Sequence, residues 1–428
     1  MLKIQEARGD CGRGLIRQLK ERGRKSNPEI EKTVAGIIGD VRAGGDRAVR
    51  EYTLKFDGVL PEPPELGREE MERAAASCGE AFRSALGRAA ANIRAFHERQ
   101  KQQSWFTTRA DGVTMGQRIR PLARVGIYVP GGTAAYPSSV LMNAVPAKIA
   151  GVGEIVMATP PGKGGRPNPD ILAAALEAGV DRVFQFGGAQ AVAALAFGTE
   201  TVPQVDKIVG PGNIYVATAK KQLFGTVGID MVAGPSEILI LADETANPVY
   251  LAADLMSQAE HDVLASAVLL TTSRKVAEQT LKELERQIRG LSRREIIGKS
   301  LDAYGAVVVC GTMDEAVGFA NELAPEHLEL CVENPAAYLG RVDNAGSVFL
   351  GNYSPEPLGD YYAGPNHVLP TGGTARFSSP LSVDSFVKKS SFLCYTKRAL
   401  ARASADITEL ASAEGLTAHA NSVRVRED

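Results

Sequence analysis

Two polar side chains that could bind one cation, Gln258 and His261, lie near the end of the stretch NPVYLAADLMSQAEHD, residues 247–262. Asn247 can cap a helix, Pro248 suits its first turn, and apolar residues follow at spacings of four. The spacing predicts a helix, and residues three apart project from the same side of it. The alternative is an exposed glutamine beside a histidine that interacts with the helix dipole.

An adjacent acid and imidazole, Glu326 and His327, occupy the segment LAPEHLEL, where a helix is predicted to end at Pro325 and a strand to begin. Residues at such a junction need not alternate between two faces as they do in a strand, so both side chains can reach one pocket. A histidine that titrates near neutral pH beside a carboxylate is suited to general-base catalysis. A salt-bridged surface corner is the alternative interpretation.

The segment of residues 346–377 is long, dense in Gly and Pro, and without regular periodicity. Long ordered loops in compact proteins usually carry function. This one contains Asp360, a candidate ligand for a hard cation, and His367, a candidate donor to a substrate. The alternative is that Asp360, which follows Gly359, only forms a turn.

Two further candidates, Glu414 and His419, lie in the C-terminal segment LASAEGLTAHA, residues 410–420. We expect a short helical tail there, with few large apolar residues to bury on its own subunit. The tail is therefore predicted to dock on a neighbouring subunit. His97, another of only five histidines, lies among charged residues, and we expect it on a solvated helix face.

Length, charge and cysteine spacing argue against nucleic-acid binding, lipid binding and a thiolate metal site. The chain has 428 residues, enough for two or three domains, and a formal net charge of -2 with a pI of about 6.3. Because basic and acidic residues are interspersed, no face is marked for nucleic acid or anionic lipid. The first residues contain no apolar signal segment, so a cytoplasmic protein is expected. The five cysteines form no CxxC pair, which leaves N and O ligands for any metal.

The elements that must position these residues follow a regular order. Residues 1 to about 120 read as helical. From residue 124, short apolar runs alternate with helices, which predicts βαβ units and a parallel sheet, and a second such series follows a break at residues 225–235. The sequence therefore predicts two α/β units in tandem, which suggests an internal duplication. We expect strands near 124–129, 154–158, 182–186, 207–209, 237–241, 266–271, 305–310, 328–332 and 346–350, and helices near 138–150, 169–178, 188–198, 213–224 and 274–289.

Glycine-rich loops follow three of the predicted strands, at residues 129–133, 187–190 and 210–213. Parallel sheets bind ligands at the carboxyl ends of their strands, where backbone N–H groups and helix N-termini can approach a phosphate. However, none of the loops has the G-x-G-x-x-G fingerprint. The loops leave two interpretations open, dinucleotide binding or simple chain reversal.

Taken together, seven segments resemble the histidinol dehydrogenase family, from roughly residue 30 to 423: PGGTAAYPSSVLMNAVPA, GPGN, AGPSE, SQAEHD, APEHLEL, GDYYAGPNHVLPT and EGLTAHA. The resemblance implies oxidation of L-histidinol to L-histidine through the aldehyde, with two successive hydride transfers to NAD at the end of histidine biosynthesis. It also implies an α/β fold with two tandem, incomplete Rossmann-like parallel-sheet domains, a helical N-terminal region and a small C-terminal helical tail.

The resemblance also assigns roles to individual residues. It implies one Zn²⁺ per subunit, held by Gln258, His261, Asp360 and His419, and an acid/base pair of Glu326 and His327. The residues that it implies in contact with substrate are Ser236, Gln258, His261, His327, Asp360, His367, Glu414 and His419. Those that it implies in contact with NAD are Tyr128, Gln190 and Asn213.

The resemblance further implies a homodimer in which the tail crosses to the partner, so that Glu414 and His419 complete the neighbouring site. We expect an N-terminal arm (1–30), a first Rossmann-like domain (31–123 with 236–380), a second on the NAD side (124–235) and a swapped tail domain (381–428).

Three alternatives remain. Cys331, four residues after His327, could act as a nucleophile in the aldehyde step, although an apolar strand favours a buried structural thiol. A relative that oxidises a different alcohol, such as a sulfonated diol, would be expected to lack His367, Glu414 or His419. A non-catalytic zinc-bound scaffold would not need Glu326 and His327.

Overall fold

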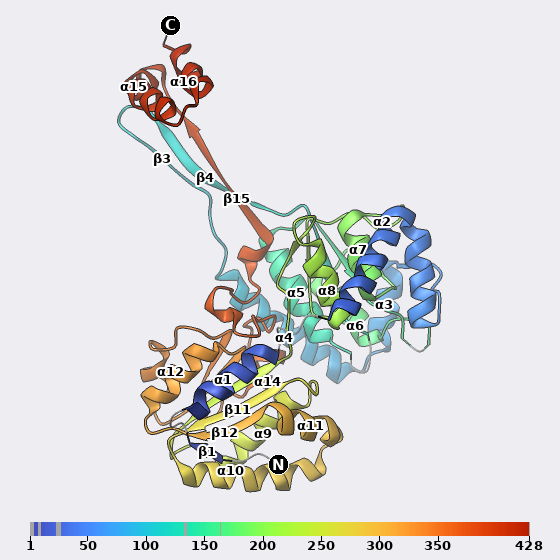
Figure 1. Ribbon diagram of the computed structural model, residues 1–428. Helices are drawn as coiled ribbons and strands as arrows, with labels where there is room; N and C mark the ends of the chain where they lie inside the picture. Colours follow the sequence, from blue (N-terminus) through green and yellow to red (C-terminus); the bar gives the residue numbers. More distant parts are fainter. Residues whose placement is uncertain (1–3, 7–9, 23–26, 132–134, 163, 428) are drawn as a thin grey trace.

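The protein consists of two α/β bodies and a long projecting arm (Figure 1). The computed structural model describes residues 4–6, 10–22, 27–131, 135–162 and 164–427. Within these ranges, none of the helices has the length and apolar character needed to cross a membrane.

The first body is built on sheet A, six parallel strands in the order β1-β12-β11-β10-β13-β14. Helices α9, α10 and α11 share one hydrophobic core with the sheet, and α1 and α12 share another, so the sheet is covered on both faces. The strands are β1 (Ile4–Glu6), β10 (Glu237–Ala242), β11 (Ser266–Thr271), β12 (Gly305–Val309), β13 (His327–Cys331) and β14 (Ser347–Leu350). The helices are α1 (Asp10–Arg22), α9 (Pro248–Ala259), α10 (Arg274–Gln287), η1 (Ile288–Gly290), α11 (Arg294–Tyr304), α12 (Met313–Leu323), α13 (Ala336–Leu339) and α14 (Glu356–Tyr361).

The second body is built on sheet B, in the order β2-β7-β6-β5-β8-β9, with only β2 antiparallel. Helices α3, α4, α5 and α6 cover one face, and α2, α7 and α8 cover the other. Its strands are β2 (Glu65–Leu66), β5 (Arg124–Tyr128), β6 (Glu154–Ala158), β7 (Arg182–Phe184), β8 (Lys207–Val209) and β9 (Gly228–Ile229). Its helices are α2 (Pro28–Asp57), α3 (Arg68–Ser77), α4 (Glu80–Glu98), α5 (Pro137–Ala150), α6 (Pro169–Ala178), α7 (Gly188–Phe197) and α8 (Ile214–Leu223).

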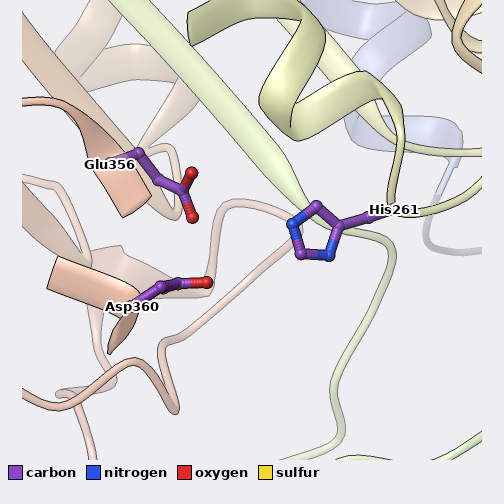
Figure 2. A group of neighbouring side chains, drawn as sticks. All are labelled: His261, Glu356 and Asp360. Carbon is purple, nitrogen blue, oxygen red and sulfur yellow. The ribbon is translucent and has the colours of Figure 1, made fainter. Parts of the chain in front are cut away.

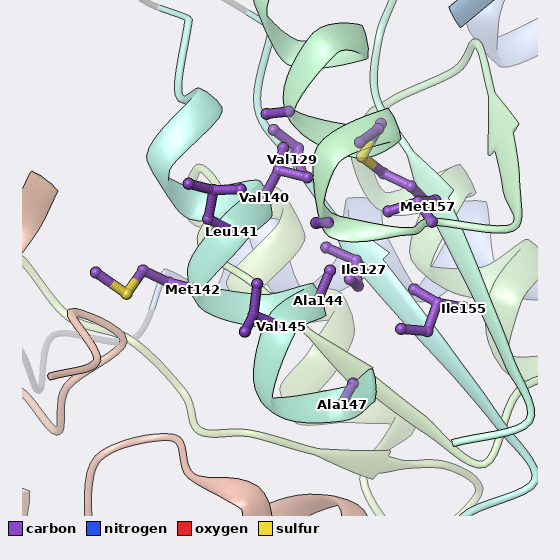
Figure 3. Close-up of a cluster of buried hydrophobic side chains, with 14 of the residues drawn as sticks. Ile127, Val129, Val140, Leu141, Met142, Ala144, Val145, Ala147, Ile155 and Met157 are labelled. Atoms are coloured by element: carbon purple, nitrogen blue, oxygen red, sulfur yellow. The ribbon is translucent and has the colours of Figure 1, made fainter. Parts of the chain in front are cut away.

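The core of the second body fixes α5 against the sheet (Figure 3). Leu141 and Ala144 of α5 are buried in one cluster with Ile127 of β5 and Ile155 of β6. Each fully buried Leu or Ile contributes roughly 1.5–3 kcal/mol of hydrophobic stabilisation relative to an exposed one. The start of α5, which approaches the other body, is therefore held rigidly.

The two sheets share one strand order, β12-β11-β10-β13-β14 in sheet A and β7-β6-β5-β8-β9 in sheet B. Within each set of five, the strand that comes first in the chain, β10 or β5, lies in the middle. The next two strands extend the sheet on one side, and the last two extend it on the other. The fold class predicted from the sequence is thus confirmed, and each of the nine predicted strands lies within about two residues of an observed one. The shared order is what an internal duplication would produce.

The arm is a three-stranded antiparallel ribbon that ends in two helices, away from both bodies in Figure 1. The prediction of a helical segment up to about residue 120 was wrong here, because residues 105–121 form two strands of the ribbon. The outer strands of the ribbon, β3 and β15, are exposed and lack the apolar alternation of a half-buried strand. Its elements are β3 (Trp105–Thr108), β4 (Thr114–Pro121), β15 (Val387–Cys394), α15 (Lys397–Ala413) and α16 (Thr417–Arg424), preceded by η2 (Thr374–Arg376) and η3 (Val383–Phe386).

The packing of the N-terminal segments differs from the predicted domain grouping. Helices α2, α3 and α4 pack on α7, α6 and α5, so most of residues 31–123 belongs with 124–235 and not with 236–380. Strand β1, within the predicted N-terminal arm, pairs with β12, so residues 4–6 are part of sheet A. An amphipathic helix pattern reveals that a face is buried but not which of two similar sheets it covers.

Candidate active site

Glu326 and His327 lie at the amino ends of the central strands of sheet A. His327 is the first residue of β13 and pairs with Ile238 near the start of β10. Both residues are buried, with exposed fractions of 7% for Glu326 and 3% for His327, so the interpretation as a salt-bridged surface corner is ruled out. The end of α9 returns to this same edge because a βαβ crossover reverses the chain direction. The candidate site is therefore at the edge opposite to the usual ligand-binding edge of a parallel sheet.

The main chain of Glu237 holds both members of the pair. Its N–H donates to Glu326 Oε2 over 2.8 Å, and its carbonyl oxygen lies 3.0 Å from His327 Nδ1. A carbonyl can only accept, so Nδ1 carries the proton of the neutral imidazole. His327 Nε2 has no hydrogen-bond partner among the described residues, and it is therefore the nitrogen free to take a proton.

Three further side chains, His261, Glu356 and Asp360, point toward one another (Figure 2). One ligand atom from each lies within 4.8 Å of the others. Glu356 and Asp360 are four residues apart on α14 and thus share one helix face. His327 Nε2 is 3.8 Å from Asp360 Oδ1 and 4.0 Å from Glu356 Oε1. A candidate metal group and the free imidazole nitrogen therefore share one site, and Asp360 is not merely a turn former.

The carboxylates of this site are crowded and buried. Burial raises the pKa of Glu326 to about 7, and burial together with the charge of Asp360 raises the pKa of Glu356 to about 8. Burial would lower the pKa of His327, but Glu326, Asp360 and Glu356 outweigh it and raise that pKa to about 10. Burial would raise the pKa of Asp360, but His327 and His367 lower it below its usual range. The site thus favours added positive charge.

The donor atoms present fit a divalent cation. Gln258 Oε1 and Glu356 Oε1 are buried and lack a hydrogen-bond partner in the described part of the chain. A buried polar atom left unpaired costs about 1–3 kcal/mol, so such atoms normally have a partner. Burial also lowers the pKa of His261, which favours the neutral imidazole that binds metals. This set of N and O donors is one that zinc accepts.

Two predicted substrate residues lie at the margin of this group. Ser236 immediately precedes β10, and its carbonyl accepts from the N–H of Ser266 over 3.0 Å. His367 Nδ1 is 3.0 Å from the carbonyl oxygen of Asp360, and its Nε2 is 3.2 Å from Ser139 Oγ in the first turn of α5. His367 therefore links the metal group to the second body.

The other two predicted residues, Glu414 and His419, lie far along the chain's arm. Both are exposed, Glu414 directly after α15 and His419 on α16. Figure 1 shows these helices at the far end of the ribbon. Within one chain, the structure does not bring Glu414 or His419 to His261.

The three predicted NAD residues lie at the carboxyl edge of sheet B, on both sides of the point where the strand order reverses. Tyr128 ends β5, and Asn213 caps α8 after β8, its Oδ1 accepting from two backbone N–H groups. Tyr128 accepts from the N–H of Gly188 over 3.1 Å, and the buried amide of Gln190 has no partner among the described residues. Gly132 and Thr133 of the 129–133 loop lie outside those residues.

The 210–213 loop is fixed by a buried ion pair between Lys220 and Asp230. Lys220 Nζ donates to the carbonyl oxygen of Gly210 over 2.9 Å, and the N–H of Gly210 donates to Asp230 Oδ2 over 2.8 Å. A Cβ at Gly210 would lie 2.2 Å from the Tyr128 carbonyl oxygen, and its φ is 111°. This glycine is therefore required for the close approach of the loop to β5.

Glu356 and Glu237 were missed by sequence reasoning. The spacing of four between Glu356 and Asp360 was a signal for a shared helix face, but the surrounding Gly and Pro residues obscured it. The prediction for His97 was wrong: it is fully buried, with Nδ1 2.7 Å from Gln100 Oε1 and Nε2 3.4 Å from Asn366 Nδ2.

Comparison with known proteins agrees with this geometry. A sequence model of the family described as Histidinol dehydrogenase matches residues 20–427. A histidinol dehydrogenase from Clostridium acetobutylicum is 57% identical over 415 residues, covering 97% of this chain and 96% of the relative. One from Geobacter sulfurreducens is 56% identical over 408 residues, covering 95% of each chain.

A crystal structure provides the same match in three dimensions. The histidinol dehydrogenase from Elizabethkingia anophelis superposes with a TM-score of 0.93 at 40% identity, covering 99% of this chain and 97% of that one. The buried pair of Glu326 and His327 and the candidate metal group agree with these likenesses, and the chain therefore belongs to the histidinol dehydrogenase family, whose members are NAD-dependent dehydrogenases.

Proposed function

We propose that the protein oxidises L-histidinol to L-histidine in two steps, each with transfer of one hydride to NAD, as the last steps of histidine biosynthesis. The first step yields L-histidinal, NADH and one proton. The second consumes water and yields the carboxylate, NADH and two protons. The observation that carries this proposal is the position of His327 Nε2, which has no hydrogen-bond partner among the described residues and lies within 4.0 Å of carboxylate oxygens of Asp360 and Glu356.

Gln258, His261 and Asp360, with His419 of the partner subunit, are the residues that would hold one zinc ion, and Glu356 lies close enough to support it. When bound, the ion would orient the imidazole and amino groups of the substrate and neutralise the carboxylates that keep His327 protonated.

His327 and Glu326 are proposed to transfer the protons in both steps. His327 Nε2 accepts the hydroxyl proton as hydride leaves the alcohol carbon. Glu326 Oε2 is occupied by the N–H of Glu237, which leaves Oε1 to accept a proton from the water that hydrates the aldehyde. Protonated His327 returns its proton to the aldehyde oxygen as the hydroxide adds, and the neutral imidazole then deprotonates the gem-diol for the second hydride transfer. Ser236 and His367 are proposed to contact the substrate.

The cofactor is proposed to bind at the carboxyl edge of sheet B, near Tyr128, Gln190 and Asn213. The reversal of strand order between β5 and β8 favours this position. Because two NAD molecules must use the site in turn, and the phosphate-binding glycine fingerprint is missing, we expect binding that is weak and readily exchanged.

The tail, residues 381–428, is proposed to reach the partner subunit of a homodimer. The exposed ribbon carries Glu414 and His419 away from their own body, and apolar residues such as Leu393 and Leu410 remain exposed on it. Each active site would then combine one body with the other subunit's tail.

The function is tested by steady-state NADH production with L-histidinol, before and after chelation. We expect two NADH per histidinol, loss of activity on removal of the metal, and recovery on addition of zinc. A sulfonated diol should not be oxidised. Full activity after complete metal removal would contradict zinc dependence, and no NADH with histidinol would contradict the function.

In the pH–rate profile of the second step, L-histidinal oxidation, the rate should fall on the acid side with a midpoint near pH 7; we call this fall the acid limb. Glu326 must be ionised to accept a proton from water, and burial raises the pKa of Glu326 to about 7. Below that pH the carboxyl is protonated and the rate of L-histidinal oxidation should fall, whereas above it the rate should level off. Glu326→Gln should abolish this limb and slow the step by about 10²–10⁴-fold. An unchanged limb in Glu326→Gln would assign it to another group.

A further inference from the structure

Arg22, at the end of α1, is a buried cation whose carboxylate partner is Glu237. Its side chain is 1% exposed, and Nη2 donates to Glu237 Oε1 over 2.7 Å and to the Pro235 carbonyl oxygen over 3.3 Å. The guanidinium carbon lies 5.5 Å from the centre of the Tyr304 ring. Nε and Nη1 have no hydrogen-bond partner within the described ranges. A buried charge is costly unless it is paired, so Arg22 and Glu237 hold each other in place.

Glu237 is also the residue whose main chain contacts both catalytic side chains. Its N–H donates to Glu326, and its carbonyl oxygen accepts from His327 Nδ1. A shift of Glu237 would therefore move the acid and the base together. Since Arg22 anchors the Glu237 side chain, the position of the pair depends on α1, a helix more than 300 residues away in sequence.

The charged groups around Glu326 also link it to Arg22 through Glu237. The charged groups that face it are His327 on β13, Glu237 on β10, Glu356 and Asp360 on α14, and Arg22 on α1. Burial raises the pKa of Glu326, the charge of His327 and the Glu237 N–H lower it, and the Glu237 carboxylate raises it by a smaller amount, while Arg22 and Glu326 attract each other. Burial raises the pKa of Glu237 and the charge of Arg22 lowers it, so Arg22 favours the ionised Glu237 and offsets its charge beside Glu326.

We propose that Arg22 is a positioning residue for the reaction, which holds Glu237 so that its main chain aligns Glu326 and His327 and which cancels the Glu237 charge next to Glu326. This rests on the proposed function only in taking Glu326 and His327 as the acid/base pair. The N-terminal helix is thus part of the catalytic structure, although it contributes no residue that touches the reacting atoms.

The proposal is tested with three variants of the full-length enzyme, Arg22→Met, Glu237→Gln and the double variant. Arg22→Met removes a cation that attracts Glu326 and leaves Glu237 unpaired, so the acid limb of L-histidinal oxidation should move to higher pH by on the order of one unit. Glu237→Gln keeps the positive charge of Arg22 and removes the negative charge of Glu237, so the acid limb should move to lower pH. The double variant removes both charges and should restore the limb of the unchanged enzyme, because neutral replacement of a buried pair is often tolerated.

A purely structural Arg22 would change kcat in proportion to the folded fraction, measured by circular dichroism, without moving the limb. If Arg22→Met does not fold, the opposite shift in Glu237→Gln and the restored limb in the double variant still test the idea. Unmoved limbs in every folded variant would overturn the proposal. An unmodified enzyme without histidinol activity would instead overturn the proposed function.

Discussion

His327→Asn should lower kcat for L-histidinol oxidation by about 10²–10⁴-fold, the usual effect of removing a positioned general base. Asparagine can still donate to the Glu237 carbonyl oxygen, so the fold should persist, but it has no nitrogen that accepts a proton as Nε2 does. KM for NAD should change little, since the proposed cofactor site lies on sheet B. Steady-state kinetics of both half-reactions, with circular dichroism to check folding, measure the effect.

The matched control is Cys331→Ser, four residues along the same strand, which should keep most activity. Cys331 is buried, and burial together with the charge of Glu329 raises the pKa of its thiol well above the usual range. A thiol that stays protonated is a poor nucleophile. The opposite result, with Cys331→Ser inactive and His327→Asn active, would reject the hydrated-aldehyde route in favour of a cysteine mechanism.

His261→Asn should remove both zinc and activity. His261 supplies the one imidazole of the group with Glu356 and Asp360, whose charges need a cation. Loss of an outer partner of a metal ligand typically weakens metal binding by about 10–100-fold, so loss of the ligand itself should weaken it by at least about 100-fold. Metal content after dialysis and NADH production at limiting zinc measure the two effects.

Glu285→Gln, on the exposed face of α10, is the control for His261→Asn and should retain one zinc per subunit with full activity. Excess zinc should partly restore His261→Asn because the remaining ligands are unchanged. A His261→Asn enzyme that keeps stoichiometric zinc and normal kcat would exclude His261 as a ligand.

The parallel sheets could be predicted because their strands are buried on both faces and read as apolar runs. The strand Glu237–Ala242 is wholly buried, as is Ser266–Thr271, and both were expected within a residue of their observed ends. The helix Pro248–Ala259 carried its own N-cap and proline, so local chemistry sufficed.

The ribbon of residues 105–121 was missed because β3 is exposed on both faces and the half-buried β4 carries only Met115 and Ile119 as large apolar residues. Asp111-Gly112, with a positive φ at Gly112, is a hairpin signal that could have revealed it. His97 was misjudged because its ring meets Asn366, which is distant in sequence. Such contacts follow from tertiary packing, which a local pattern does not contain.

The site itself could be anticipated only in part. The residue types of Gln258 and His261 suggested a cation, but their meeting with Asp360 was implied only by family resemblance. Glu356 was absent from that inference, and the structure adds it. The position of the pair at the amino edge of sheet A also runs against the general rule for parallel sheets, so no fold-level argument would have located it.

Mixing two inactive variants tests most directly the claim that one zinc site is completed by two subunits. At limiting zinc, His261→Asn and His419→Asn should each be inactive alone. After dissociation and reassociation in equal amounts, each mixed dimer has one intact site, so activity should recover to roughly a quarter of the unmodified enzyme's. No recovery, with mixed dimers verified by differential tags, would contradict a site shared between subunits.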